Sequence, residues 1–157
     1  MLSSWLHLTA LAVYLGSVVG LSMILLPALS VIQNHEGQMK LLARCLKLYN
    51  PLQTGILGLL VLSGALQLTA LKATYRELFM KELGVTLGLK LILSFVLILL
   101  SVYQSMGVAH RFVRRYEGEE PLSPQELGSV VQRLRVSALS ILLLGLLTAW
   151  LGMRLRG

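Results

Sequence analysis

The sequence is poor in charged residues, cysteine and histidine. Only 13% of its 157 residues are charged, whereas a soluble globular domain usually has about 25%. The single cysteine, Cys45, excludes an internal disulfide, and together with only three histidines it excludes zinc-finger spacings. These shortages exclude a soluble domain, a disulfide-stabilised fold and a zinc-finger protein.

Long apolar runs take the place of the missing charge. Hydrophobic residues make up 55% of the chain, and the mean hydropathy is +0.75. Since a membrane-spanning helix needs roughly 20 apolar residues, the runs predict an all-α, antiparallel, up-down-up-down bundle of four transmembrane helices. We expect one domain over residues 1–157, with spans at residues 5–32, 51–71, 84–108 and 136–153. The lipid bilayer is therefore the first expected partner.

The polar connections also contain helix signals. Ser123, Pro124 and Glu126 supply an N-cap hydroxyl, a proline in the first turn and a capping-box carboxylate. The fourth helix is therefore predicted to begin there, outside the membrane core. The apolar spacing before the second span predicts that its helix starts near Gly37 and bends at Pro51.

The distribution of basic residues predicts an orientation. A net charge of +7 also fits nucleic-acid binding, but basic residues that flank apolar spans orient a membrane protein, so we expect no nucleic-acid partner. Eight Lys and Arg lie on the side that connects spans one and two, against five on the terminal side once Lys90 is set aside. The positive-inside rule then predicts that this side is cytoplasmic and that both termini lie outside. We expect the membrane to be the bacterial inner (plasma) membrane.

Glycine pairs four residues apart occur in the first and third spans. Gly16 and Gly20 form GSVVG, and Gly84 and Gly88 form GVTLG. This spacing of small residues lets helix backbones approach closely. We interpret it as packing within the chain. Association with a second copy or another membrane subunit is the alternative.

Polar side chains at membrane depth are the candidates for function, because they are costly there. His7, Gln67 and Lys90 all lie near the terminal side of the membrane and are predicted to converge, and Gln53 and Thr54 are further candidates. His7 is interpreted as a metal ligand or redox site, or as an interfacial anchor. Lys90 is interpreted as an inward-facing partner for an anionic group such as a propionate, or as a cation that reaches the headgroups.

The positions of the histidines and methionines in the sequence restrict which metal sites the chain can form. The membrane core separates His7 from His35 and His110. A two-histidine haem clamp would therefore need His35 and His110, and the alternative is His7 with Lys90 or alone. The six methionines suit Cu(I) but are scattered without an MxxM pair. Cys45 is interpreted as a packed thiol.

Three segments resemble a known membrane superfamily. WLHLTALAVYLGSVVGLSMILLPAL, which contains His7, resembles the first helix of the CopD copper-resistance family and of the HemJ-type protoporphyrinogen oxidases. ARCLKLYNPLQTGILGLLVLSG is similar to their second helix, and LGLKLIL, which contains Lys90, to their third. Gly88 stands where HemJ-type proteins usually have a histidine.

The resemblance implies four membrane helices and a bound b-type haem or, in the CopD branch, copper handling. His7 would take the place of the helix-one histidine and Lys90 that of the helix-three lysine. We therefore expect a small haem-associated redox protein or membrane subunit, and leave open whether it is an enzyme. The alternative is a non-catalytic membrane protein, either a copper-handling transporter or an accessory subunit of a larger complex. The expected cofactor site consists of His7 as metal ligand with Lys90, Gly16, Gly20 and Gln67.

Overall fold

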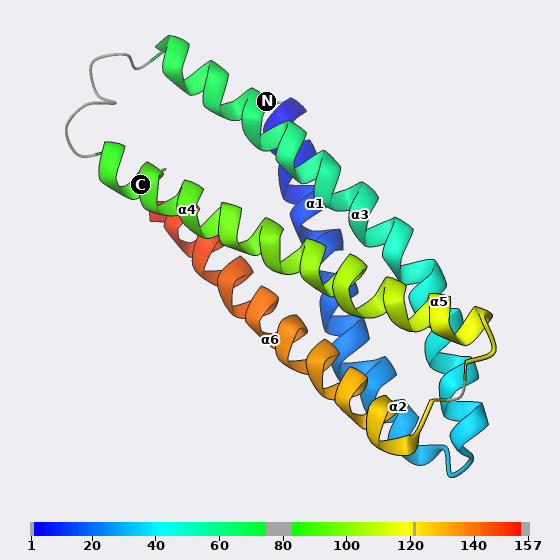
Figure 1. Cartoon of the computed structure of the whole chain (residues 1–157). Coiled ribbons are helices and arrows are strands. Elements are labelled where there is room, and N and C mark those ends of the chain that lie inside the picture. The colour runs from blue at the N-terminus through cyan, green and yellow to red at the C-terminus, as the bar shows by residue number, and fades with distance from the viewer. Residues whose placement is uncertain (1, 75–82, 121, 155–157) are drawn as a thin grey trace.

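The described residues form an all-α bundle of four membrane-length segments that run alternately up and down (Figure 1). The structure is a computed structural model that describes residues 2–74, 83–120 and 122–154. In chain order the elements are α1 (Leu2–Val19), the π-helical η1 (Gly20–Leu25), α2 (Leu26–Val31), α3 (His35–Thr74), α4 (Leu83–Val102), the π-helical η3 (Tyr103–His110), α5 (Arg111–Glu117) and α6 (Pro124–Arg154).

Four stretches of the described chain are long and apolar enough to cross a membrane. They are Ser4–Val31, His35–Thr69, Gly84–Glu117 and Pro124–Met153. The four-helix membrane bundle is confirmed. The second to fourth stretches extend beyond the predicted spans, because each helix continues into a polar connection.

The start of α6 follows its capping signal. The Ser123 hydroxyl accepts a hydrogen bond from the Glu126 backbone N–H at 3.2 Å, and the Glu126 carboxylate accepts one from the Ser123 N–H at 2.9 Å. This reciprocal pair satisfies two backbone donors that a helix start leaves without partners. The predicted start of the fourth helix is confirmed at Pro124.

α3 is a single helix that passes through Pro51. It begins at His35, close to the predicted start at Gly37. Figure 1 shows its axis changing direction in the half nearer His35, and Pro51 lies within this helix. A proline removes one backbone hydrogen bond and crowds the preceding turn, which favours such a bend without ending the helix.

The helices are arranged so that α3 and α4 form an open edge. We call the end that holds both chain termini the terminal end, and the opposite end, with α2 and α5, the connection end (Figure 1). α1 packs along α3, α6 packs along α4, and α1 and α6 join the two pairs. The third membrane segment consists of α4, η3 and α5, and α3 meets it mainly through η3 and α5. α3 and α4 therefore diverge toward the terminal end.

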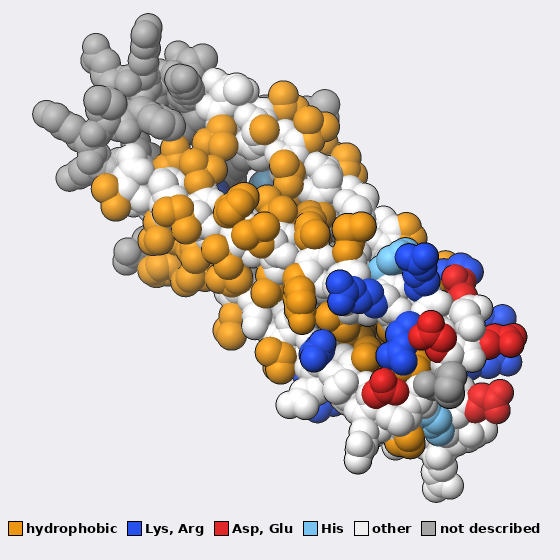
Figure 2. All heavy atoms as spheres, viewed as in Figure 1, with side chains coloured by type: hydrophobic (Ala, Val, Ile, Leu, Met, Phe, Trp, Pro, Cys, Tyr) orange, Lys and Arg blue, Asp and Glu red, His pale blue; other side chains and the backbone are white. Residues whose placement is uncertain are grey.

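Two apolar cores hold the bundle together. One lies at the connection end and includes Leu46 of α3, Phe112 of α5 and Leu134 of α6. The other lies further along the bundle and includes Val18 of α1 and Ile141 of α6. On the face that Figure 2 shows, apolar side chains cover much of the described surface away from the connection end, and the charged groups of the described residues gather at the connection end around α5. Such a surface suits a bilayer along the apolar length and water or headgroups at the charged end.

The predicted packing role of the glycine pairs is wrong for Gly16, Gly20 and Gly88. A Cβ atom added at any of these positions would meet no atom within 4 Å outside the local helix. The close approach occurs instead at Gly145 of α6, where an added Cβ would lie 2.6 Å from the Leu15 Cδ2 atom. Spacing shows that a helix has a small face, but it does not show whether that face points at a neighbouring helix.

Candidate functional site

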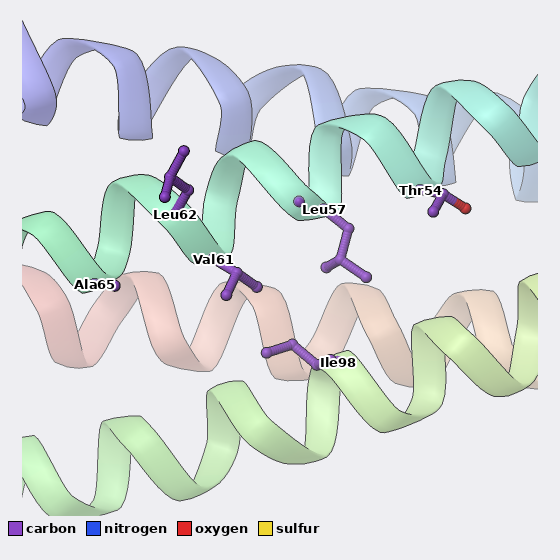
Figure 3. Close-up of a pocket in the computed structure, with 7 residues that line it drawn as sticks. Thr54, Leu57, Val61, Leu62, Ala65 and Ile98 are labelled. Atoms are coloured by element: carbon purple, nitrogen blue, oxygen red, sulfur yellow. The ribbon is translucent and has the colours of Figure 1, made fainter.

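A cleft lies between α3 and α4. A cavity of about 530 Å³ lies there, and Thr54 is the one polar residue among those that line it. Figure 3 shows Leu57 and Val61 of α3 directed toward Ile98 of α4 across this space. Gly58 also lines the cavity, and its missing side chain leaves the wall open. We call this space the apolar cleft.

A second cavity adjoins the apolar cleft on the side of the connection end. Its volume is about 290 Å³, and it shares Thr54 and Leu57 with the apolar cleft. Its lining is more polar than that of the cleft, and it includes Asn50, Gln53, Ser101, Ser105 and His110. The two cavities therefore form one elongated space with an apolar part and a polar part.

The π-helical turn η3 shapes the polar part. Buried residues recur there at every fourth position, in two sets. One set is Gln104, Val108 and Phe112, and the other begins with Ser105 and Ala109. A regular α-helix has about 3.6 residues per turn, so positions four apart drift around its surface. The wider π turns counter this drift and keep both sets directed into the bundle.

A tyrosine in the middle of α1 reaches across the bundle to α4. The Tyr14 hydroxyl is hydrogen bonded to the Ser101 hydroxyl, and Tyr14 is fully buried. Ser101 in turn donates to the Leu97 carbonyl at 2.7 Å. Because Ser101 has one hydroxyl proton, Tyr14 is the donor to Ser101.

Two buried glutamines continue the polar cluster into α3 and α6. Gln53 Nε2 donates to Gln104 Oε1 at 3.2 Å, and Gln104 Nε2 donates to the Leu134 carbonyl at 3.4 Å. Both glutamines are at most 1% exposed. The cluster therefore links all four membrane segments at a depth where polar groups need partners.

Some polar atoms at this site are buried without a partner within the described ranges. They are Gln53 Oε1, Asn50 Oδ1 and the Tyr49 hydroxyl. Buried polar atoms are nearly always hydrogen bonded, so each exception calls for an explanation. Asn50 and Gln53 line the polar cavity, so two residues of its wall each carry a buried, unpartnered carbonyl oxygen.

His7 is held against α3 by a serine. The distance between His7 Nδ1 and the Ser63 hydroxyl oxygen is 2.9 Å, and Ser63 donates its own proton to the Leu60 carbonyl at 3.1 Å. Nδ1 therefore carries the hydrogen that is donated to Ser63. Gly64 lies beside the ring, because a Cβ added there would be 3.5 Å from His7 Cε1. The site fixes the position of the His7 ring and the role of Nδ1 as donor.

The other residues expected near His7 lie on different helices. Gln67 follows Ser63 by one turn of α3 and therefore shares its helix face. Lys90 packs against α6, since a Cβ added at Gly152 would lie 3.0 Å from Lys90 Nζ. In Figure 2 atoms of a histidine and of a basic side chain are visible in the hollow near the terminal end. The convergence of His7, Gln67 and Lys90 on one cofactor stays a prediction.

The remaining two histidines are at the connection end. His35 Nε2 donates to the Leu122 carbonyl at 2.8 Å, and His110 is exposed at the polar cavity. His7 therefore does not flank a single iron together with either of these two histidines. Within residues 2–74, 83–120 and 122–154, no three His, Cys, Asp or Glu side chains come together as a metal site.

Sequence reasoning missed the role of Tyr14 and Ser101. The available signal was a lone tyrosine in the middle of an apolar run, where its hydroxyl needs a partner at membrane depth. Serine gives no such signal, because it is common in membrane helices and bonds to its own helix backbone. Only the fold shows that Ser101 lies opposite Tyr14.

No family model, curated protein or solved structure matches this chain. The resemblance to the CopD and HemJ-type families stays a prediction. The function is therefore argued from the apolar cleft, the polar cavity and His7.

Proposed function

We propose that the protein binds a lipid-soluble small molecule in the apolar cleft between α3 and α4. The observation that carries this proposal is an apolar cavity of about 530 Å³ that continues into a polar one. Small-molecule sites are typically concave, mostly apolar and roughly 300–1,000 Å³ in volume, with a few polar groups that orient the ligand. Because α3 and α4 diverge along membrane-length helices, the ligand enters sideways from the bilayer.

The proposed location is the bacterial inner membrane, with the connection end in the cytoplasm and both termini outside. The charged groups around α5 support this orientation, because basic residues are enriched on the cytoplasmic side. Some of these charged groups form ion pairs, such as Lys47 with Glu117 at 2.6 Å and Arg115 with Glu120 at 2.9 Å. The lipid bilayer is then both the solvent and the source of the ligand.

Filling the apolar cleft is expected to prevent binding. Gly58→Leu places a side chain in the cleft, where a Cβ meets no atom within 4 Å, so the helix keeps its packing while the ligand loses its space. We expect Gly58→Leu to bind the ligand at least about tenfold more weakly than the wild type. The measurement is photolabelling of the protein in nanodiscs with a diazirine-bearing hexadecyl chain, with labelled positions mapped by mass spectrometry.

Gly55→Leu is the matched control for this experiment. Gly55 is an exposed glycine of the same helix, it also has no atom within 4 Å of an added Cβ, and it does not line the cleft. We expect it to leave labelling of Leu57, Val61 and Ile98 unchanged. Equal labelling of these residues in both variants would refute the proposal.

A second candidate function is haem-linked electron transfer, and the geometry of His7 favours it. A metal-binding histidine usually donates its other ring N–H to a neighbouring group, which orients the ring. The Nδ1–H of His7 donates to Ser63, which orients the ring in the way expected of one axial ligand. His7 would hold the iron, Lys90 would pair with a propionate, and a bound b-type haem would supply one-electron chemistry.

The test of this second candidate is the haem content of purified variants. His7→Ala is expected to abolish bound haem, because it removes the ligand nitrogen, while His110→Ala and Cys45→Ala are expected to retain it. The measurement is a pyridine haemochrome assay with oxidised and dithionite-reduced spectra. Equal haem in all variants would refute the role of His7. A colourless wild-type protein would favour the non-catalytic alternatives of copper handling, tested by Cu(I) titration, or an accessory subunit.

A further inference from the structure

Two residues that line the polar cavity carry buried acceptor atoms that no donor in the described structure satisfies. Gln53 is 1% exposed, and its Nε2 is committed to Gln104, which leaves Oε1 as an unpartnered acceptor. Asn50 Oδ1, one helical turn earlier on α3, is a second unpartnered acceptor. Both residues line the polar cavity.

The hydroxyl groups around this cavity do not supply the missing donors. Ser101 uses its proton on the Leu97 carbonyl. Thr54 and Ser105 lie 3.5 Å apart and pair with each other through one of their two hydroxyl protons. No donor of the described residues reaches Gln53 Oε1 or Asn50 Oδ1, which favours a ligand group that donates hydrogen bonds to them.

The charge pattern selects a neutral donor. The chain has no aspartate, and no glutamate within the described residues lines either cavity. An ammonium group at this depth would lack a counter-ion, and His110 at the cavity adds no negative charge. Carboxylate and phosphate groups offer acceptors only, so they do not complement the two carbonyl oxygens.

We infer that the polar cavity is a head-group subsite for a neutral, hydroxyl-bearing amphiphile whose apolar tail occupies the apolar cleft. This inference rests on the proposed function and specifies the ligand class, a long-chain alcohol or a molecule with an equivalent hydroxyl head. The hydroxyl donates to Gln53 Oε1, and Thr54 and Leu57 lie where head and tail meet.

The test compares two photoprobes that differ only in the hydroxyl proton. They are diazirine-bearing hexadecanol and its methyl ether, both presented to the full-length protein in nanodiscs. We expect the alcohol to bind roughly tenfold more tightly or better, because the ether leaves the acceptors unpaired. A hexadecylamine probe is expected to bind more weakly than the alcohol.

A double variant tests whether Gln53 makes this distinction. Gln53→Leu alone leaves Gln104 Oε1 without its donor, so Gln53→Leu combined with Gln104→Leu removes both partners of the pair. We expect this variant to bind alcohol and ether equally, with ether binding as in the wild type. Gln132→Leu, an exposed position on α6, is the matched control and is expected to keep the preference.

The outcomes separate the inference from the function on which it rests. Equal binding of alcohol and ether to the wild type, still blocked by Gly58→Leu, would overturn the head-group subsite and leave the cleft proposal intact; it is also the result expected if water satisfies the acceptors. Tighter binding of the amine would overturn the choice of a neutral head group. Absence of labelling by every probe would overturn the proposed function itself.

Discussion

Leu46→Ala is expected to lower the free energy of unfolding by about 2–5 kcal/mol. Leu46 is fully buried in the connection-end core, where α3 packs near Leu134 of α6 and Phe112 of α5. Removing its side chain leaves a cavity that the surrounding helices fill only in part. The measurement is reversible unfolding in mixed micelles, followed by the loss of helical circular dichroism.

Leu48→Ala is the control for this experiment. Leu48 lies two residues further along the same helix but is 75% exposed. Its removal is expected to change the free energy of unfolding by no more than about 0.5 kcal/mol. Equal destabilisation by both variants would mean that the core does not lie where the bundle places it.

Gln104→Leu is expected to destabilise the bundle by about 1–3 kcal/mol, because it leaves Gln53 Nε2 buried without its acceptor. The double variant of Gln53→Leu with Gln104→Leu removes both partners and is expected to be more stable than the sum of the single changes predicts. The measurement is a double-mutant cycle of unfolding free energies. Additive effects would show that the two side chains are not coupled.

The double-mutant cycle tests whether buried hydrogen bonds help to determine which helices pair in the bundle. Apolar contacts between membrane helices gain little from leaving lipid, because lipid tails are as apolar as leucine. Buried hydrogen bonds contribute to which helices pair, and the cluster of Tyr14, Gln53, Ser101 and Gln104 joins α1, α3, the third segment and, through the Leu134 carbonyl, α6. The same cluster closes the polar end of the proposed binding site.

Part of the candidate site was visible in the sequence. Gln53 and Thr54 were identified because they are polar at membrane depth, and both line the cavities. His7 was identified for the same reason, and it has a specific partner in Ser63. The partners themselves were not predictable, because Ser63 lies 56 residues along the chain from His7 and serine is ordinary in a membrane helix.

The glycine prediction failed for a related reason. In a soluble helix the apolar stripe shows which face is buried. In a membrane helix the outer face is as apolar as the inner one, so the sequence has no stripe to show where Gly16 and Gly20 point. Gly145 approaches another helix closely, and it is followed four residues later by Ala149, a small-residue spacing that a search for glycine pairs alone does not find.

The sequence by itself determined that the chain is a four-helix membrane bundle and that α6 starts at Pro124. These features follow from local properties: hydropathy over a span and capping chemistry. Only the tertiary structure decided that α3 diverges from α4, that Tyr14 meets Ser101 and that Gln53 and Asn50 have unpartnered oxygens at a cavity. Those features depend on how each helix is rotated about its axis, and uniformly apolar helices record little of that rotation in their sequence.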